Sequence, residues 1–131
     1  MKKLVLAVIA SCFCISANAA CDTKSLKGNY MIQGIYTGYK SSYPTTCGDI
    51  GIIQFDGKGG AVGVGFESCA GTTYALPKQT GTYQIDALCS GSIVFGTMEI
   101  KYIFDKTLKS GVILGANPDY LSSGVGTILK Q

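Results

Sequence analysis

The sequence contains no histidine, no tryptophan and no arginine, so all eleven of its basic residues are lysines. Without histidine, the commonest general base and a major metal ligand are missing. Without arginine, the planar fork that recognises phosphates and guanine edges is missing as well. No run of like charge marks a nucleic-acid or membrane-surface patch. These absences argue against nucleic acid as a partner and against histidine-based catalysis.

Catalytic patterns built on other residues are also scarce. Asp49 and Asp119 are the carboxylates that could meet at one end of the fold, as glycosidase chemistry requires, but solvated loop acids are far commoner. Neither a G-x-S-x-G elbow nor a serine–lysine pairing stands out. The stretch FDGKGG (55–60) matches neither glycine-rich phosphate-binding pattern and predicts a hairpin turn. We therefore expect no enzymatic activity and no cofactor.

The first 20 residues, MKKLVLAVIASCFCISANAA, combine two lysines, an apolar run and small residues, which is typical of a cleaved signal peptide. Cleavage would leave residues 21–131 as one domain, exported to the periplasm or outside the cell, and would lower the net charge from +3 to +1. A lipid anchor at Cys12 is the competing interpretation, although the apolar run before it is short. No later segment approaches the roughly 20 apolar residues of a transmembrane helix.

Short alternating apolar runs, split by turn residues, predict an all-β fold. In SIVFGTMEIKYIFD (92–105), Val94 and the even-numbered residues from Met98 to Phe104 are apolar, whereas Glu99 and Lys101 have the other parity. No window of helical length shows a comparable 3.6-residue stripe. Eight strands are expected, with bounds near Gly28–Thr37, Asp49–Asp56, Ala61–Ser68, Thr80–Asp86, Gly91–Phe95, Met98–Asp105, Ser110–Ala116 and Ser122–Lys130.

Short sequential connections favour a single up-and-down antiparallel β-barrel, since closure removes the exposed strand edges. In such a meander, the first, third, fifth and seventh connections lie at one end, here named end 1, and the others lie at end 2. End 1 is expected to hold the stretch 36–47 (YTGYKSSYPTTC), the loop 70–79 (AGTTYALPKQ) and the loop 117–120 (NPDY), with all three prolines. End 2 holds tight turns. We therefore expect end 1 to be the mouth.

Four cysteines, Cys21, Cys47, Cys69 and Cys89, remain after the signal peptide, and an even number in an exported domain predicts two disulfides. Cys47 and Cys69 are equidistant from Lys58, the centre of a predicted hairpin, so both fall at end 1. The other two fall at end 2, about 25 Å away and beyond disulfide reach. We predict the pairs Cys47–Cys69 and Cys21–Cys89. A metal site would need thiolates from both ends, so no metal is expected.

The lead into LKGNY (26–30) and the glycine-punctuated strands resemble small bacterial lipocalin-like (calycin-type) barrels. Gly28-Asn29-Tyr30 stands where lipocalins have G-x-W, which closes one barrel end, and Asp119-Tyr120 partly matches their T-D-Y. The arginine that packs on that tryptophan is absent, and so is the C-terminal helix. The resemblance covers residues 21–131 as architecture and implies the barrel rather than a particular ligand.

The expected function is binding of a small apolar ligand by a monomer, through a tyrosine-rich rim at end 1. Ordinary packing is the alternative for any single tyrosine. The glycines Gly34, Gly51, Gly96 and Gly126 could either leave room inside the barrel or relieve crowding where strands coil. The expected contact surface comprises Tyr36, Tyr39, Lys40, Tyr43, Tyr74, Lys78 and Tyr120.

A second function remains open, in which the barrel core is filled and the protein acts on another protein. A hydrolase inhibitor or a host-directed effector would fit that description. The two functions differ in cavity volume, because a carrier needs an open apolar cavity and an interaction protein does not.

Overall fold

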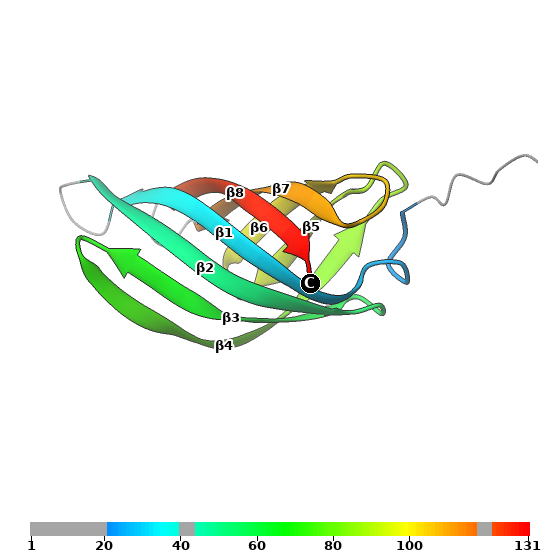
Figure 1. Cartoon of the computed structure of the whole chain (residues 1–131), viewed down its shortest axis with the longest axis horizontal. Coiled ribbons are helices and arrows are strands. Elements are labelled where there is room, and N and C mark those ends of the chain that lie inside the picture. The colour runs from blue at the N-terminus through cyan, green and yellow to red at the C-terminus, as the bar shows by residue number, and fades with distance from the viewer. Residues whose placement is uncertain (1–20, 40–43, 118–121) are drawn as a thin grey trace, which may run out of the picture.

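Eight antiparallel strands, joined in chain order, close into a barrel in the computed structural model of the chain (Figure 1). The structure describes residues 21–39, 44–117 and 122–131. β1 pairs with both β2 and β8, which closes the sheet and confirms the predicted all-β, up-and-down barrel. The strands are β1 (Lys27–Tyr39), β2 (Pro44–Asp56), β3 (Gly60–Cys69), β4 (Thr72–Ile85), β5 (Ser90–Phe95), β6 (Met98–Phe104), β7 (Ser110–Asn117) and β8 (Ser122–Lys130).

Two predicted loops at end 1 are wrong in extent because the first four strands are longer than expected. Tyr36 and Cys47, the ends of the stretch 36–47, are cross-strand partners in the β1–β2 hairpin. The predicted loop 70–79 belongs mostly to β4, which begins at Thr72. Together these changes extend one side of the barrel toward end 1.

Pro77 lies inside β4 because a bulge accommodates it. Gly65 pairs with Leu76 and Gly63 pairs with Gln79, so that Pro77 and Lys78 face the single residue between these glycines on β3. A bulge tolerates the missing N–H of proline. The proline had predicted a loop, and the bulge is the reason why this prediction is wrong.

The side chains at the end-2 half of the barrel form a closed aromatic core. Phe55 is edge-on to both Tyr30 and Tyr83, with ring centroids 5.2 and 4.9 Å apart. Tyr102 and Phe104 complete the cluster, and Tyr102 donates its hydroxyl proton to the Gln84 carbonyl at 2.8 Å. Since each such side chain contributes about 1.5–3 kcal/mol on burial, this cluster accounts for a large part of the stability.

Tyr30 seals end 2, at the place where the resemblance to lipocalins puts the G-x-W tryptophan. Its side chain is fully buried, and its hydroxyl donates to the Leu108 carbonyl at 3.0 Å. The Nζ atom of Lys130 lies 5.7 Å from the ring centroid, which is a cation–π distance. Leu26, also fully buried, covers the core from the lead-in segment.

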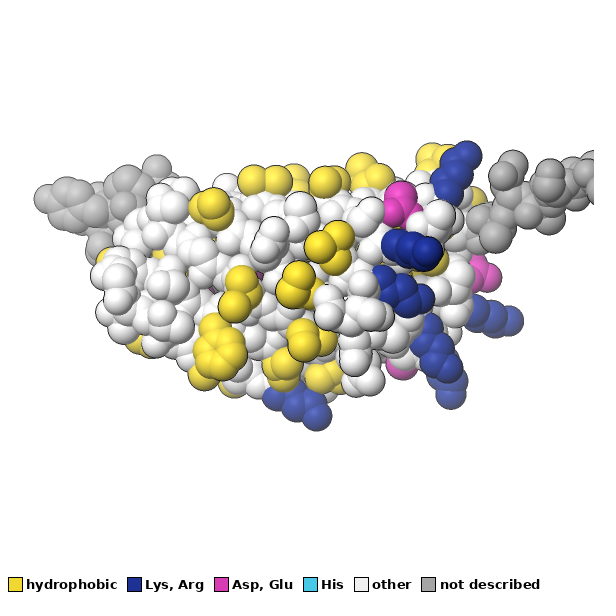
Figure 2. Space-filling view, viewed as in Figure 1, with side chains coloured by type: hydrophobic (Ala, Val, Ile, Leu, Met, Phe, Trp, Pro, Cys, Tyr) yellow, Lys and Arg dark blue, Asp and Glu magenta, His cyan; other side chains and the backbone are white. Residues whose placement is uncertain are grey.

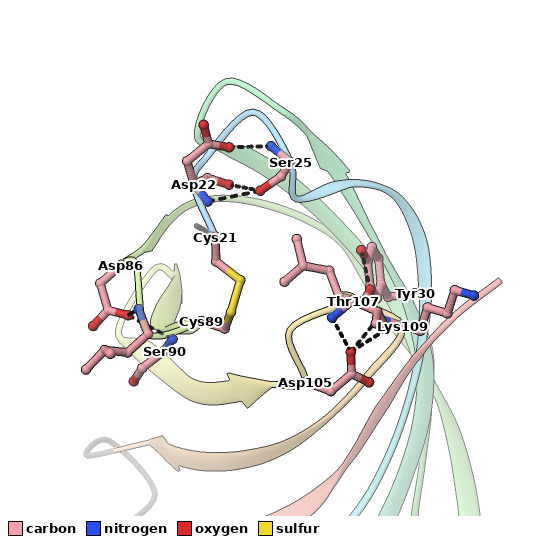
Figure 3. The surroundings of a disulfide bond; sticks show 12 residues. Cys21, Asp22, Ser25, Tyr30, Asp86, Cys89, Ser90, Asp105, Thr107 and Lys109 are labelled. Carbon is pink, nitrogen blue, oxygen red and sulfur yellow. Dashed lines mark hydrogen bonds between the residues drawn. A yellow bond between two sulfur atoms is a disulfide. The ribbon is translucent and has the colours of Figure 1, made fainter. Parts of the chain in front are cut away.

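Both predicted disulfides are confirmed. Cys21 and Cys89 are joined at end 2 with their Cα atoms 5.0 Å apart, and this bond ties the lead-in segment to the β4–β5 turn (Figure 3). Cys47 and Cys69 are directly opposed partners on β2 and β3, with Cα atoms 4.4 Å apart. The barrel is thus linked covalently near both ends.

Three turns at end 2 are organised by aspartates in equivalent positions. Asp56 accepts hydrogen bonds from the amides of Lys58 and Gly60, at 2.7 and 2.9 Å. Asp86 accepts equivalent bonds from the amides of Leu88 and Ser90. Asp105 accepts them from the amides of Thr107 and Ser110 (Figure 3). These bonds satisfy turn amides and favour the ionised carboxylates.

One predicted strand parity is wrong. Ile93 and Phe95 are buried in the barrel, whereas Val94 is 40% exposed on the outside. Phe95 pairs with Met98 across the Gly96-Thr97 turn, so the inward-facing residues change from odd to even numbers at this turn. A two-residue hairpin turn always produces this change, because partners across it share a face.

Candidate functional site

The end-1 half of the barrel encloses a cavity of about 640 Å³. Its apolar lining borders the aromatic core and comes from strands all around the barrel, with Ile32 on β1, Ile53 on β2, Phe95 on β5, Ile100 on β6 and Ile113 on β7. All but Ile32 are buried, so this part of the cavity is shielded from solvent. The interior is therefore filled at end 2 and hollow at end 1.

Inward glycines contribute to the cavity in two different ways. A Cβ atom at Gly51 would lie 2.6 Å from the Val64 carbonyl oxygen, so this glycine relieves crowding between coiled strands. Gly126 is crowded by the backbone of β1 in the same manner. Gly115 lines the cavity with open space beside it, and therefore does leave room. Gly96 belongs to the β5–β6 turn with φ of +58°, so it has a conformational role there.

The cavity has a polar side formed by two carboxylates on neighbouring strands. Asp49 on β2 and Glu67 on β3 are cross-strand partners, and both line the cavity. The Asp49 carboxylate lies over Gly34 of β1, where a Cβ atom would come within 2.7 Å of Oδ1. The glycine at position 34 thus makes the space that this carboxylate occupies.

Burial and nearby charges raise the pKa values of two groups on this polar side, Asp49 and Tyr36. Burial raises the pKa of Asp49, the hydrogen bond to its own backbone amide lowers it, and the charge of Glu67 raises it again. Burial also raises the pKa of the Tyr36 hydroxyl, and a hydrogen bond to Glu67 and the charges of Glu67 and Asp49 raise it further. Tyr36 therefore stays protonated and acts as a donor toward the carboxylates.

The Cys47–Cys69 disulfide forms part of the same wall. The Cys69 Sγ atom is 2.9 Å from Glu67 Oε1 and 3.8 Å from the Tyr36 hydroxyl. Possible ligand atoms of Cys47, Glu67 and Cys69 lie within 4.8 Å of one another, which resembles a metal-binding cluster. The disulfide takes up both thiolates, so this cluster cannot hold a metal while the bond is intact.

The sequence-predicted contact residues fall into three groups. Tyr36 and Tyr74 line the cavity, Tyr36 half-buried and Tyr74 53% exposed. Lys78 is exposed in the β4 bulge and is not among the lining residues, although its neighbours Pro77 and Gln79 are. The side chains of Tyr39, Lys40, Tyr43 and Tyr120 lie outside the described part of the chain, and Asp119 does as well. The predicted contact surface therefore stays a prediction.

Sequence reasoning missed the pairing of Asp49 with Glu67, although a usable signal was present. These two positions are equidistant from Lys58, the same criterion that paired Cys47 with Cys69. Applied to every residue of the hairpin, this criterion would have placed the two carboxylates side by side on the inward face.

The wall of the cavity is incomplete beside β4. Pairing between β4 and β5 begins at Thr82, so within the described residues the segment Thr72–Gly81 has no β5 partner. Pro77 and Lys78 lie on this segment, and residues of these types protect a free edge against pairing with other chains. The hydrogen-bonded sheet is therefore incomplete on this side of end 1.

Comparisons with known proteins do not assign the chain to a group. No family model matches the sequence, and no curated protein matches it either. The structure shows no helix, among the residues it describes, that is long and apolar enough to cross a membrane.

Proposed function

We propose that the protein is an exported, non-enzymatic binding module that holds one small, mainly apolar molecule in the end-1 half of its barrel. The cavity of about 640 Å³ carries this proposal, because binding sites for small molecules are typically about 300–1,000 Å³. The filled aromatic half forms a rigid floor below it. Two disulfides support an oxidising, exported location.

The polar side of the cavity indicates which kind of ligand it favours. Asp49 and Glu67 are adjacent carboxylates, and no lysine is among the described lining residues. A ligand that brings a positive charge or hydrogen-bond donors would relieve their repulsion. We therefore propose an apolar ligand with an amine or a similar donor group at one end, which Tyr36 and Tyr74 flank.

A dye-binding experiment with two matched variants tests the cavity. The probe is N-phenyl-1-naphthylamine, an uncharged apolar dye whose fluorescence rises in apolar surroundings. Gly115→Phe should place a ring in the open space beside residue 115 and abolish the rise. Ile103→Phe is the control, because residue 103 is exposed on the outside of β6 and does not line the cavity. Equal dye binding by both variants would contradict the proposal.

The ligand class has its own test with a pair of dansyl dyes. Dansylcadaverine carries a primary amine, whereas dansylamide is neutral and has the same ring system. The wild-type protein should bind the amine more tightly, and Asp49→Asn combined with Glu67→Gln should remove that preference while dansylamide binding stays. Loss of binding to both dyes would show that the carboxylates support the fold and do not select the ligand.

The second candidate, a filled barrel that acts on another protein, is less well supported because the end-1 half is hollow. Exposed apolar side chains on the outside nevertheless favour an interaction with another protein surface.

A further inference from the structure

The outer surface of the barrel carries a broad apolar face. Ten large apolar side chains on five neighbouring strands, β7, β8, β1, β2 and β3, point away from the core and are 38–65% exposed. We name this set the apolar face. Its members are Met31, Ile35, Ile50, Ile52, Val64, Phe66, Val112, Leu114, Val125 and Leu129.

The strand register arranges the apolar face in three cross-strand rows. The first row is Leu114–Val125–Ile35, the second is Val112–Thr127–Gln33–Ile50–Phe66, and the third is Leu129–Met31–Ile52–Val64. Gln33 and Thr127 are the polar members of these rows, and neither is charged. Figure 2 shows apolar side chains spread over the middle of the face that includes β8, β1, β2 and β3, with most of the visible lysines toward one end.

The exposed area of this face is large enough for a stable interface. From the exposed fractions, the ten side chains present about 1,000 Å² of surface, against about 800 Å² per partner in a standard protein–protein interface. Soluble monomers rarely expose a contiguous apolar patch of more than a few hundred Å².

The shape of the face suits a second copy of itself. A depression of about 600 Å³ lies on it, with Ile35, Ile50 and Val125 in its lining and Phe66 at the β3 side. Phe66 is 54% exposed and is the largest side chain of the face. The exposed ring of Phe66 and the other apolar side chains of this lining can contact the same residues of a second copy, because a two-fold axis brings identical patches together.

The charge distribution also favours a second copy. The rows carry no charge, and Asp49 and Glu67, which are in the lining of the depression, occupy inward-facing positions, so the outward side chains of two identical faces meet without repulsion between like charges. Lys27, Lys58, Lys109 and Lys130 all lie at end 2, outside the rows. A two-fold axis perpendicular to the barrel axis would place end 2 of each copy beside end 1 of the other and keep the lysines apart.

A surrounding lipid bilayer fits the molecule less well. Transmembrane strands need about 9–11 residues, and β5 and β6 have 6 and 7. On β6 the outward residues are Glu99, Lys101 and the 57% exposed Ile103, which alternate with the buried Ile100, Tyr102 and Phe104, so two of the three outward side chains are charged. The apolar surface is therefore strongest on one side of the barrel, as expected for contact with one partner.

We propose that the protein forms a two-fold symmetric dimer through the apolar face, in place of the monomer that its sequence led us to expect. The side chains of the apolar face point outward, whereas the cavity lies inside the barrel, and the two share the strand segments that carry Ile35, Ile50, Ile52, Val64 and Val125. Gln33 lies in the second row between Thr127 and Ile50, at the centre of the face.

Sedimentation velocity of the exported protein, with its disulfides intact, tests this proposal. The wild type should sediment as a dimer, and Gln33→Lys should weaken the dimer at least about tenfold, because each copy then buries an unpaired charge. Gln84→Lys is the matched control, since it places the same charge on the exposed surface of β4, outside the face. This control should dimerise like the wild type.

Two further measurements keep the test decisive. Phe66→Thr removes the exposed ring without adding charge, and it should also weaken the dimer while near-ultraviolet circular dichroism shows an intact fold.

A wild type that stays monomeric at about 100 µM would overturn the proposal, since an interface of this size supports far tighter association. Binding of that monomer to phosphatidylglycerol vesicles would assign the face to lipid instead. Equal weakening by Gln84→Lys would also overturn it.

Discussion

Removal of each disulfide in turn should destabilise the barrel unequally. The Cys47–Cys69 bond closes a sequence separation of 22 residues and the Cys21–Cys89 bond one of 68. Loop-closure entropy then predicts a loss of about 3 kcal/mol for the first and about 4 kcal/mol for the second, through the unfolded state. The double variants Cys47→Ser/Cys69→Ser and Cys21→Ser/Cys89→Ser measure the two losses.

A second effect increases the difference between the two variants. The Cys21–Cys89 bond anchors the lead-in segment, whose Leu26 side chain is fully buried over the aromatic core. If the segment detaches, this burial is lost as well, at a further cost of about 1.5–3 kcal/mol. Removal of the Cys47–Cys69 bond exposes no comparable core residue, because that bond lies in the wall of the cavity.

Guanidinium-induced unfolding, followed by tyrosine fluorescence, measures both free energies of unfolding. We expect both variants to fold, with the Cys21/Cys89 variant the less stable by at least about 1 kcal/mol. Equal losses, or a larger loss for the Cys47/Cys69 variant, would refute the argument that end 2 carries most of the packing energy. The slope of the transition should be slightly smaller in the Cys21/Cys89 variant, because a detached lead-in segment already exposes surface in its folded state.

Two predictions concern pH. Hydrogen bonds from the Ser110 and Thr107 side chains are the main cause that holds the pKa of Asp105 well below its usual value, and turn amides lower that of Asp56. These carboxylates therefore stabilise the fold above their unfolded pKa of about 3.9, and the melting temperature should fall as the pH drops below that value, less steeply in Asp105→Asn. Asp49 is the opposite case, because burial raises its pKa, so its charge destabilises the fold at neutral pH. Asp49→Asn should raise the melting temperature at pH 7 and have little effect near pH 3, and an unchanged melting temperature at pH 7 would show that the Asp49 carboxylate is not strained by burial.

The architecture was predictable because each part of it follows from local chemistry. The Asp-Gly and Gly-Gly pairs of FDGKGG require positive φ, and Gly57 and Gly59 have it, which centred the first hairpin on Lys58. That centre, together with strand length, determined which cysteines could meet. Short connections between successive strands then predicted an antiparallel meander, and closure of that meander into a barrel removes its exposed edges.

The features that were missed depend on contacts that no short pattern records. Pro77 predicted a loop, because only the register between β3 and β4 shows that a bulge removes the need for its N–H. Val94 was placed on the wrong face, since a two-residue turn changes the parity between β5 and β6. Whether Gly115 or Gly51 borders open space depends on the coiling of neighbouring strands.

Native mass spectrometry of the protein from its own cells, with disulfides intact, tests most directly whether the end-1 cavity holds a ligand. We predict a reproducible adduct of one small molecule per chain, lost on denaturation and absent from Gly115→Phe. Each chain should weigh four hydrogens less than its reduced form, as two disulfides require. A wild-type chain that carries no adduct, and takes up no N-phenyl-1-naphthylamine when the dye is added, would contradict the central claim.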